Sequence, residues 1–206
     1  MSAIFKNKKK DTETFLKLSD YERQIRSLNR QLIKYQKGFH KLTRYNDSSD
    51  IIIYNRYVDS HFWVISVKYD WNCQNRKLKF ELRDMLDNRA VDYFQGQLWM
   101  KFLYSDEGKL KGFWISEFQT KIKNKGYGSM LLGEALWYIA QTFGTSLELR
   151  GWLSFVDEQD PENHKRRDHI YQKFGFEIDG EYFCLKGLSL DKIIEKRAKW
   201  HDKSSS

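Results

Sequence analysis

Proline, cysteine and long apolar runs are scarce in this chain of 206 residues. Pro161 is the only proline, and the two cysteines, Cys73 and Cys184, lie far apart without the C-x-x-C spacing of metal or redox motifs. This pattern argues against a disulfide framework and against zinc, so we expect no bound metal. No stretch is apolar over the length of a bilayer span, and no charged-apolar-small segment opens the chain. We therefore expect a cytoplasmic protein that does not contact a membrane.

Positive charge is concentrated near the start of the chain. The formal net charge is +8, and residues 1–50 hold twelve Lys and Arg against six Asp and Glu. The remaining residues are therefore close to balanced. A basic arm of this kind can meet nucleic acid, an acidic protein surface or only water. We favour a solvated helix surface over nucleic-acid binding.

Apolar residues recur at alternating three- and four-residue steps within the first 48 residues. They are Leu18, Tyr21, Ile25, Leu28, Leu32, Tyr35, Phe39 and Leu42. This is the coiled-coil period, and basic residues fill the outer faces, so residues 1–48 are predicted as an amphipathic heptad helix. An apolar stripe of that length has to be covered. It could pack on the rest of the chain or pair with a second copy, and we favour a homodimer.

Several β-prone runs precede residue 118. They cover residues 51–54, 62–67, 78–82, 98–104 and 110–118. The segment Ser105-Asp106-Glu107-Gly108 is typical of a hairpin turn between the last two. With later strand-like runs at 146–153 and 176–178 and helical segments between them, the pattern predicts a mixed α/β (α+β) domain over residues 49–188. Residues 189–206 are predicted as a C-terminal helix and a Ser-rich tail.

A glycine-containing turn lies between a strand and a helix. It reads Lys123-Asn124-Lys125-Gly126-Tyr127-Gly128, after the apolar run 113–118 and before an amphipathic segment. A strand that ends in glycines at the start of a helix presents backbone N–H groups and the positive end of the helix dipole, which together bind phosphate. Gly126 and Gly128 carry no side chain to block that approach. The turn therefore predicts a phosphate or pyrophosphate site.

A second pattern follows the strand-like run 146–153. Asp160 is a suitable N-cap, and Pro161 occupies the first helical position. The helix is expected to end at Gly175 in a left-handed conformation. A further strand is then expected to start at Phe176.

The two patterns together resemble the GNAT superfamily of N-acetyltransferases. Their pyrophosphate loop, Arg/Gln-x-x-Gly-x-Gly/Ala, is matched by Lys123–Gly128, and their Tyr-x-Lys-x-Gly-Phe stretch by Tyr171–Phe176. The resemblance covers residues 110 to about 188. It implies a mostly antiparallel sheet that splays between two parallel strands, 110–118 and 146–155, with helices on both faces.

Three positions depart from the family pattern. Lys123 replaces the usual Arg or Gln, and the asparagine that usually starts the last helix is His164 by strict spacing or Asn163 with a one-residue shift. The loop at 155–159 is longer than usual. The two helices that normally follow the first strand are also hard to find: either they are shortened to residues 84–93, or the heptad helix supplies part of them.

The resemblance implies that acetyl-CoA is the cosubstrate and that its acetyl group passes to a primary amine by direct attack in a ternary complex. The loop would bind the diphosphate, and the first strand would pair with the pantetheine arm. The residues it implies for binding are Phe118, Thr120, Lys123, Asn124, Lys125, Gly126, Tyr127, Gly128, Ser129, Asn163, His164 and Lys173. The sequence leaves the acceptor amine open.

Tyr171 and Glu117 are the candidate catalytic residues. Tyr171 occupies the family's tyrosine position beside the CoA sulfur and would act as general acid, unless its ring only packs. Strand alternation predicts that Phe113, Ile115 and Glu117 share one face. Glu117 would serve as base if that face looks toward the acceptor; otherwise a water chain would take the proton.

His164 and Asp168 lie four residues apart in the predicted last helix, and so on one face of it. They could form a second acid–base pair. A helix-surface ion pair of small energetic value is the interpretation we favour.

A different class of function is also compatible with the sequence. The chain could be a basic coiled-coil interaction protein whose GNAT-like module is not catalytic and whose arm binds nucleic acid or an acidic partner. The concentrated charge of residues 1–50 favours this alternative. The loop glycines favour the enzyme, because a scaffold has no need for a close approach of backbone to phosphate.

Overall fold

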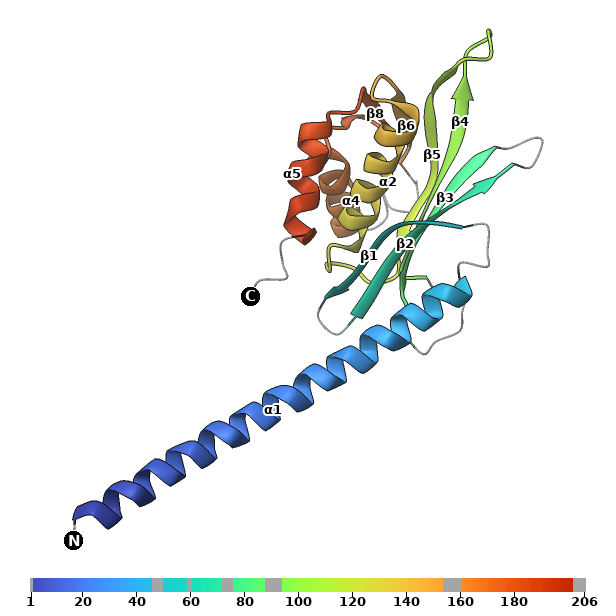
Figure 1. The fold of residues 1–206 in the computed structure, drawn as a ribbon. Coiled ribbons are helices and arrows are strands. Elements are labelled where there is room, and N and C mark those ends of the chain that lie inside the picture. The colour runs from blue at the N-terminus through green and yellow to red at the C-terminus, as the bar shows by residue number, and fades with distance from the viewer. Residues whose placement is uncertain are drawn as a thin grey trace. The chain divides into compact units, whose positions relative to one another are not determined.

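The structure is a computed structural model. It describes residues 2–45, 50–58, 61–71, 76–87, 94–153 and 161–201. The chain divides into two compact units, Met1–Arg44 and Tyr45–Ser206. The helices are α1 (Ser2–Tyr45), α2 (Tyr127–Phe143), α4 (Pro161–Lys173) and α5 (Leu190–His201) (Figure 1). The strands are β1 (Ile51–Val58), β2 (His61–Asp70), β3 (Lys77–Asp84), β4 (Gly96–Tyr104), β5 (Leu110–Thr120), β6 (Glu148–Trp152), β7 (Glu177–Asp179) and β8 (Tyr182–Lys186).

The first unit is the single long helix α1, longer than the heptad pattern alone required. Among the predicted seam residues, Tyr21, Ile25, Leu28, Leu32 and Phe39 are each more than half exposed in one chain. The ion pairs described along this helix are also exposed, so they add at most a few tenths of a kcal/mol each. These exposed apolar side chains would be stabilised by contact with a further surface that covers them.

The second unit is built on one eight-stranded sheet in the order β1-β2-β3-β4-β5-β6-β8-β7. Neighbouring strands are antiparallel except β5 and β6, which are parallel. The predicted mixed α/β class with a mostly antiparallel sheet is thus confirmed. The Ser105–Gly108 hairpin turn is also confirmed, with the Gly108 N–H donating to the Ser105 carbonyl.

A β-bulge in β5 changes which residues face each side of the sheet. Trp99 of β4 lies opposite Glu117, but the next residue, Met100, lies opposite Ile115, so Ser116 is an extra residue. Phe118 and Ile115 therefore share one face. The prediction that Glu117 lies on the face of Ile115 is wrong, because alternation does not continue through a bulge.

The described helices of the second unit lie on one side of the sheet (Figure 1). Helix α2 packs on strands β1, β3, β4 and β5, and α5 packs on α2. The resemblance predicted helices on both faces, and in the described part of this unit the opposite face carries none. The segment proposed for the shortened helices, 84–93, lies mostly outside the described residues, as does Asp160. Pro161 does begin α4, and Gly175 follows that helix with a φ of +90°.

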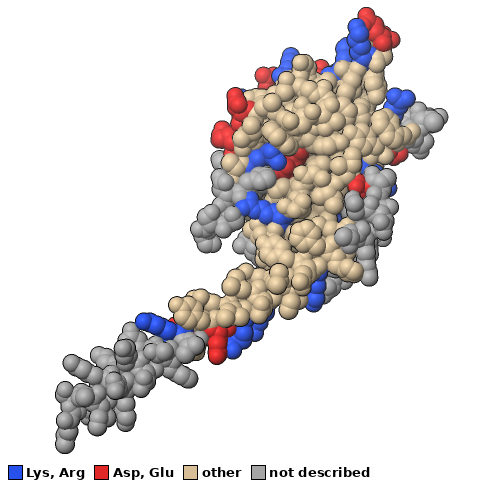
Figure 2. Space-filling view, in the orientation of Figure 1, with Lys and Arg blue, Asp and Glu red and all other residues tan. Residues whose placement is uncertain are grey.

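Charged side chains of both signs are interspersed on one face of the second unit. On the side drawn in Figure 2, Lys and Arg occur in small groups beside Asp and Glu rather than in one continuous basic patch. No helix of the described residues is both long and apolar enough to cross a membrane.

A buried ion pair fastens the C-terminal helix to the helix that follows the glycine turn. Glu134 of α2 is fully buried and accepts hydrogen bonds from Arg197 Nε and Nη2 at 2.9 and 2.8 Å. The guanidinium also lies 4.4 Å from the Trp137 ring. A bidentate pair of this kind supplies charge-assisted hydrogen bonds to both oxygens of a buried carboxylate.

Replacing Arg197 should therefore destabilise the second unit. Arg197→Met removes both guanidinium hydrogen bonds and the opposite charge from the buried Glu134 carboxylate, so we expect a loss of about 3 kcal/mol in the free energy of unfolding measured with urea. The exposed neighbour change Lys192→Met should cost little. Adding Glu134→Leu to Arg197→Met should restore much of the stability, and a double variant no more stable than the single one would contradict this role.

Candidate functional site: a cleft beside the glycine turn

The site begins where strand β5 separates from β6. The two strands pair only from Gly112 to Ile115 on β5, opposite Glu148 to Gly151. Strand β5 continues to Thr120, whereas β6 ends at Trp152. Beyond Ile115 the edge of β5 that faces away from β4 thus has no β6 partner among the described residues. Backbone groups along this part of the edge need a hydrogen-bond partner other than β6.

Gly126 and Asn124 shape the turn that follows β5. Gly126 has a φ of +78° and Asn124 a φ of +59°, both in the left-handed region. The Gly126 carbonyl accepts the Met130 N–H at 3.0 Å, which closes the first turn of α2. The preceding N–H groups of that turn have no partner within the helix and lie at the positive end of its dipole. This geometry suits an anion.

A cleft of about 510 Å³ lies beside this turn. It is lined by Phe118, Gln119, Thr120, Ile122, Lys123, Asn124, Gly126, Tyr127, Gly128, Ser129, Asn163, Arg166, Arg167, His169 and Ile170. None of these lining residues is Asp or Glu, and three are Lys or Arg. The lining is therefore basic in composition as well as rich in hydrogen-bond donors, which favours a phosphorylated ligand.

Helix α4 forms the wall opposite the turn. It approaches so closely that a Cβ built on Gly128 would lie 3.0 Å from Cδ1 of Ile170 on α4. The same Cβ would lie 3.4 Å from Cζ of Phe118 on β5. Asn163, Arg167 and Ile170 recur at helical spacing, with Arg166 beside them, so one stripe of α4 faces the cleft. Glycine at 128 allows the two helices to meet there.

Nine of the twelve residues predicted for binding line this cleft, on the turn, the end of β5 and the start of α4. Lys125, His164 and Lys173 are not among the lining residues. Of the two alternatives for the family's asparagine, Asn163 lies in the cleft. The sequence interpretation missed Gln119, Ile122 and the α4 stripe beyond Asn163. Helical spacing from Asn163 would have found Arg166, Arg167 and Ile170.

Tyr171 lies next to the cleft but is not among the residues that line it. Its side chain is 4% exposed, and its ring stacks on Phe183 with centroids 4.0 Å apart. It also meets the ring of Phe118, a cleft residue, edge-on at 6.0 Å, and Phe176 at 5.3 Å. Packing therefore fixes the position of the ring.

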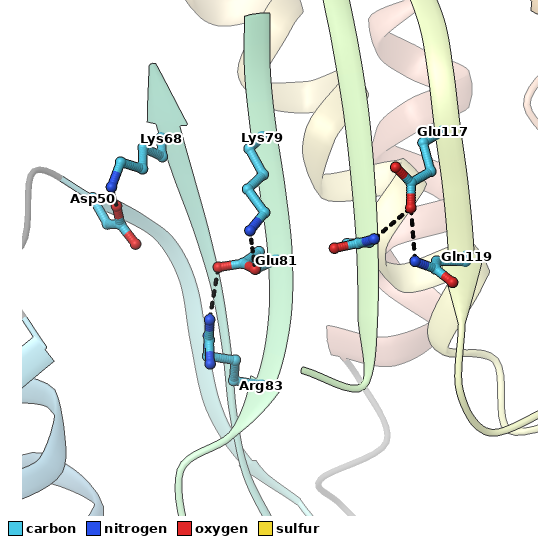
Figure 3. Close-up of polar contacts among 8 residues, drawn as sticks. Asp50, Lys68, Lys79, Glu81, Arg83, Glu117 and Gln119 are labelled. Carbon is cyan, nitrogen blue, oxygen red and sulfur yellow. Dashed lines mark hydrogen bonds and ion pairs between the residues drawn. The ribbon is translucent and has the colours of Figure 1, made fainter. Parts of the chain in front are cut away.

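Glu117 lies on the sheet face opposite to α2, with two amide side chains as partners. Its Oε1 accepts hydrogen bonds from Gln97 Nε2 at 2.5 Å and Gln119 Nε2 at 2.7 Å (Figure 3). Gln97 is 8% exposed, whereas the Glu117 side chain is exposed. The amides orient the carboxylate and leave it accessible from that face.

The same face carries a row of polar side chains along β3 (Figure 3). Glu81 is paired with Lys79 at 2.7 Å and with Arg83 at 2.8 Å. Burial alone would raise the pKa of Glu81, but the hydrogen bonds from Lys79 and Arg83 outweigh it and hold the pKa below its usual value. Lys79 also lies 5.0 Å from the Trp99 ring, whose Nε1 is buried with no hydrogen-bond partner in the described structure.

The Cys184 thiol and the His164–Asp168 pair are each held by contacts with nearby side chains. Burial and the hydrogen bond to Glu148 raise the pKa of the Cys184 thiol, which keeps it protonated and a poor nucleophile. His164 Nε2 lies 2.9 Å from Asp168 Oδ2, and the two side chains are 40% and 19% exposed. Within the described residues, no group of three or more His, Cys, Asp or Glu is placed to hold a metal ion.

No protein-family model matches this chain, and comparison with curated proteins finds no match. The geometry of the cleft and the motifs therefore carry the functional argument alone.

Proposed function

We propose that this protein is an N-acetyltransferase of the GNAT type, which transfers an acetyl group from acetyl-CoA to a primary amine. The observation that supports this most strongly is the coincidence of two features at one place. Strand β5 loses its β6 partner after Ile115, and the same strand runs directly into a left-handed glycine turn that opens α2. A splayed parallel pair and an anion-binding helix start are both needed to bind a long, phosphorylated thioester.

In this proposal the ligand follows the strand edge and the turn. The CoA diphosphate binds the N–H groups at the start of α2, with Lys123 close by. The pantetheine arm pairs with the edge of β5 beyond its pairing with β6, near Phe118 and Thr120, much as another strand would. The thioester then lies in the gap between β5 and β6.

The amine nitrogen attacks the thioester carbonyl carbon, forming a C–N bond and breaking the C–S bond. The departing CoA thiolate takes a proton from the Tyr171 hydroxyl, which the stacking on Phe183 holds in place. The attacking nitrogen, left with an extra proton, releases it to the Tyr171 phenolate, directly or through water, which gives the neutral amide and restores the hydroxyl. Backbone N–H groups at the splay would stabilise the oxyanion. The ammonium form of the acceptor first loses a proton to Glu117 or to a water chain.

The acceptor side is the sheet face of Glu117. Both amides bind the same oxygen, Oε1, and the Glu117 side chain is exposed. An amine that approaches from this face would meet a carboxylate already oriented by Gln97 and Gln119.

The rival function, a non-catalytic module with a basic interaction arm, makes a different prediction for the cleft, because such a module needs no acetyl-CoA binding. On the side drawn in Figure 2 the second unit offers no continuous basic patch for nucleic acid. Binding measurements on the turn therefore separate the two functions.

The turn can be tested with a pair of matched glycine variants. Gly126 has a φ of +78° and Gly108 a φ of +76°, and an added Cβ meets nothing within 4 Å at either position. Valine should strain both backbones to a similar degree. We expect Gly126→Val to weaken acetyl-CoA binding at least tenfold by calorimetry, whereas Gly108→Val in the distant hairpin binds as the parent does.

Equal acetyl-CoA affinity in both valine variants and the parent would contradict the turn as a phosphate site. A parent that binds no acetyl-CoA would favour the non-catalytic alternative.

Removing the Tyr171 hydroxyl should slow the reaction without weakening the ligand. Tyr171→Phe keeps the stacking on Phe183, so we expect turnover, read as released thiol with a panel of amines, to fall about a hundredfold while acetyl-CoA affinity stays unchanged. Tyr182→Phe, which changes an exposed tyrosine on β8, is the control. Unchanged turnover in Tyr171→Phe across pH would make Tyr171 a packing residue.

We also propose that α1 forms a coiled-coil homodimer. Its seam keeps the heptad period. Tyr21, Ile25, Leu28, Leu32 and Phe39 are each more than half exposed in one chain, whereas Leu42 at the end of the seam is buried. The charged residues lie outside the seam, so a second copy can cover it without burying a charge.

Light scattering should therefore give twice the chain mass for the intact protein. Leu28→Asp with Leu32→Asp places charges in the seam and should give a monomer that still binds acetyl-CoA. Arg30→Asp with Lys34→Asp, which has the same spacing outside the seam, should leave the dimer intact. A monomeric parent protein would exclude this dimer.

A further inference from the structure

The α4 wall of the cleft carries arginines in addition to the donors of the turn on the opposite wall. The start of α2 and Lys123 already offer donors and charge on the opposite wall. Arg166 and Arg167 add two guanidinium groups on α4. These two arginines differ in their partners, and the difference identifies the one available to a ligand.

Arg167 is held by a carboxylate. Its Nε and Nη2 both lie 3.1 Å from Asp168 Oδ1, and its side chain is 10% exposed. Asp168 in turn meets His164. Arg167 is therefore part of an ion-pair network along α4, and its charge is largely balanced there.

Arg166 has a neutral partner instead. Its Nη2 donates a hydrogen bond to the Asn163 side-chain oxygen, one turn earlier on the same helix. Both residues line the cleft, whose lining contains no carboxylate. The amide orients the guanidinium without neutralising it, and this is a suitable arrangement for a second phosphate.

We propose that Arg166 binds the 3′-phosphate on the ribose of CoA and so makes the site selective for acetyl-CoA over its 3′-dephospho form. This inference rests on the proposed function, and it assigns a part of the ligand that the turn does not account for. CoA carries its phosphates at two places, the diphosphate and the ribose, which matches the two cationic walls. The planar guanidinium can donate two parallel hydrogen bonds to one phosphate.

The experiment measures the affinity of the full chain for acetyl-CoA and for 3′-dephospho-acetyl-CoA by calorimetry. Charge-assisted hydrogen bonds of this kind predict that the parent protein prefers acetyl-CoA by about ten- to a hundredfold. Arg166→Gln should lower acetyl-CoA affinity to that of the dephospho form and leave the dephospho affinity unchanged. Lys165→Gln, an exposed neighbour outside the cleft, should keep the full preference. Circular dichroism checks that each variant is folded.

Two results overturn the inference and leave the proposed function in place. One is equal affinity of the parent for both ligands. The other is an equal loss of affinity for both ligands in Arg166→Gln, which would mean that Arg166 contacts the diphosphate or the adenine. No binding of either ligand to the parent overturns the proposed function, and the inference with it.

Discussion

The cleft depends on the point where strand β5 stops pairing with β6. Over Gly112–Ile115 the parallel pair is tight enough that a Cβ on Gly112 would lie 1.8 Å from the Glu148 carbonyl oxygen, so only glycine fits there. Immediately after Ile115 the bulge at Ser116 turns the strand, which directs Phe118 and Thr120 toward the helices. Residues 116–120 thus have no β6 partner, and the bulge at Ser116 reverses which of their side chains face the helices. The same residues lead into the glycine turn.

The elements around the cleft are fixed by contacts that do not involve the ligand. The Glu134–Arg197 pair holds α2 against α5, while Tyr171 and Ile170 attach α4 to the sheet and to the first turn of α2. A binding site whose walls are held in this way loses less conformational entropy when a ligand binds. This preorganisation is consistent with a site built for one long, charged ligand.

The features predicted correctly from the sequence are those in which the residue type itself restricts the local backbone. The glycine turn, Pro161 at the start of α4 and the left-handed Gly175 are positions where few residue types are allowed, and all were predicted. The sheet face on which Glu117 lies was not predicted correctly. One extra residue at Ser116 reverses the alternation of faces, and no residue type in this stretch signals the bulge. Arg166 was missed for another reason: its importance comes from a neutral partner and from the opposite wall, which only the fold brings together.

The central claim is that acetyl-CoA lies between the turn and α4. Hydrogen exchange of the intact protein, measured by mass spectrometry with and without acetyl-CoA, tests it most directly because exchange reports where backbone groups are covered. The account predicts slower exchange in peptides that span residues 116–130 and 161–171, with little change in β1–β3 or α1. Unchanged exchange at the turn, or protection confined to the first unit, would contradict it.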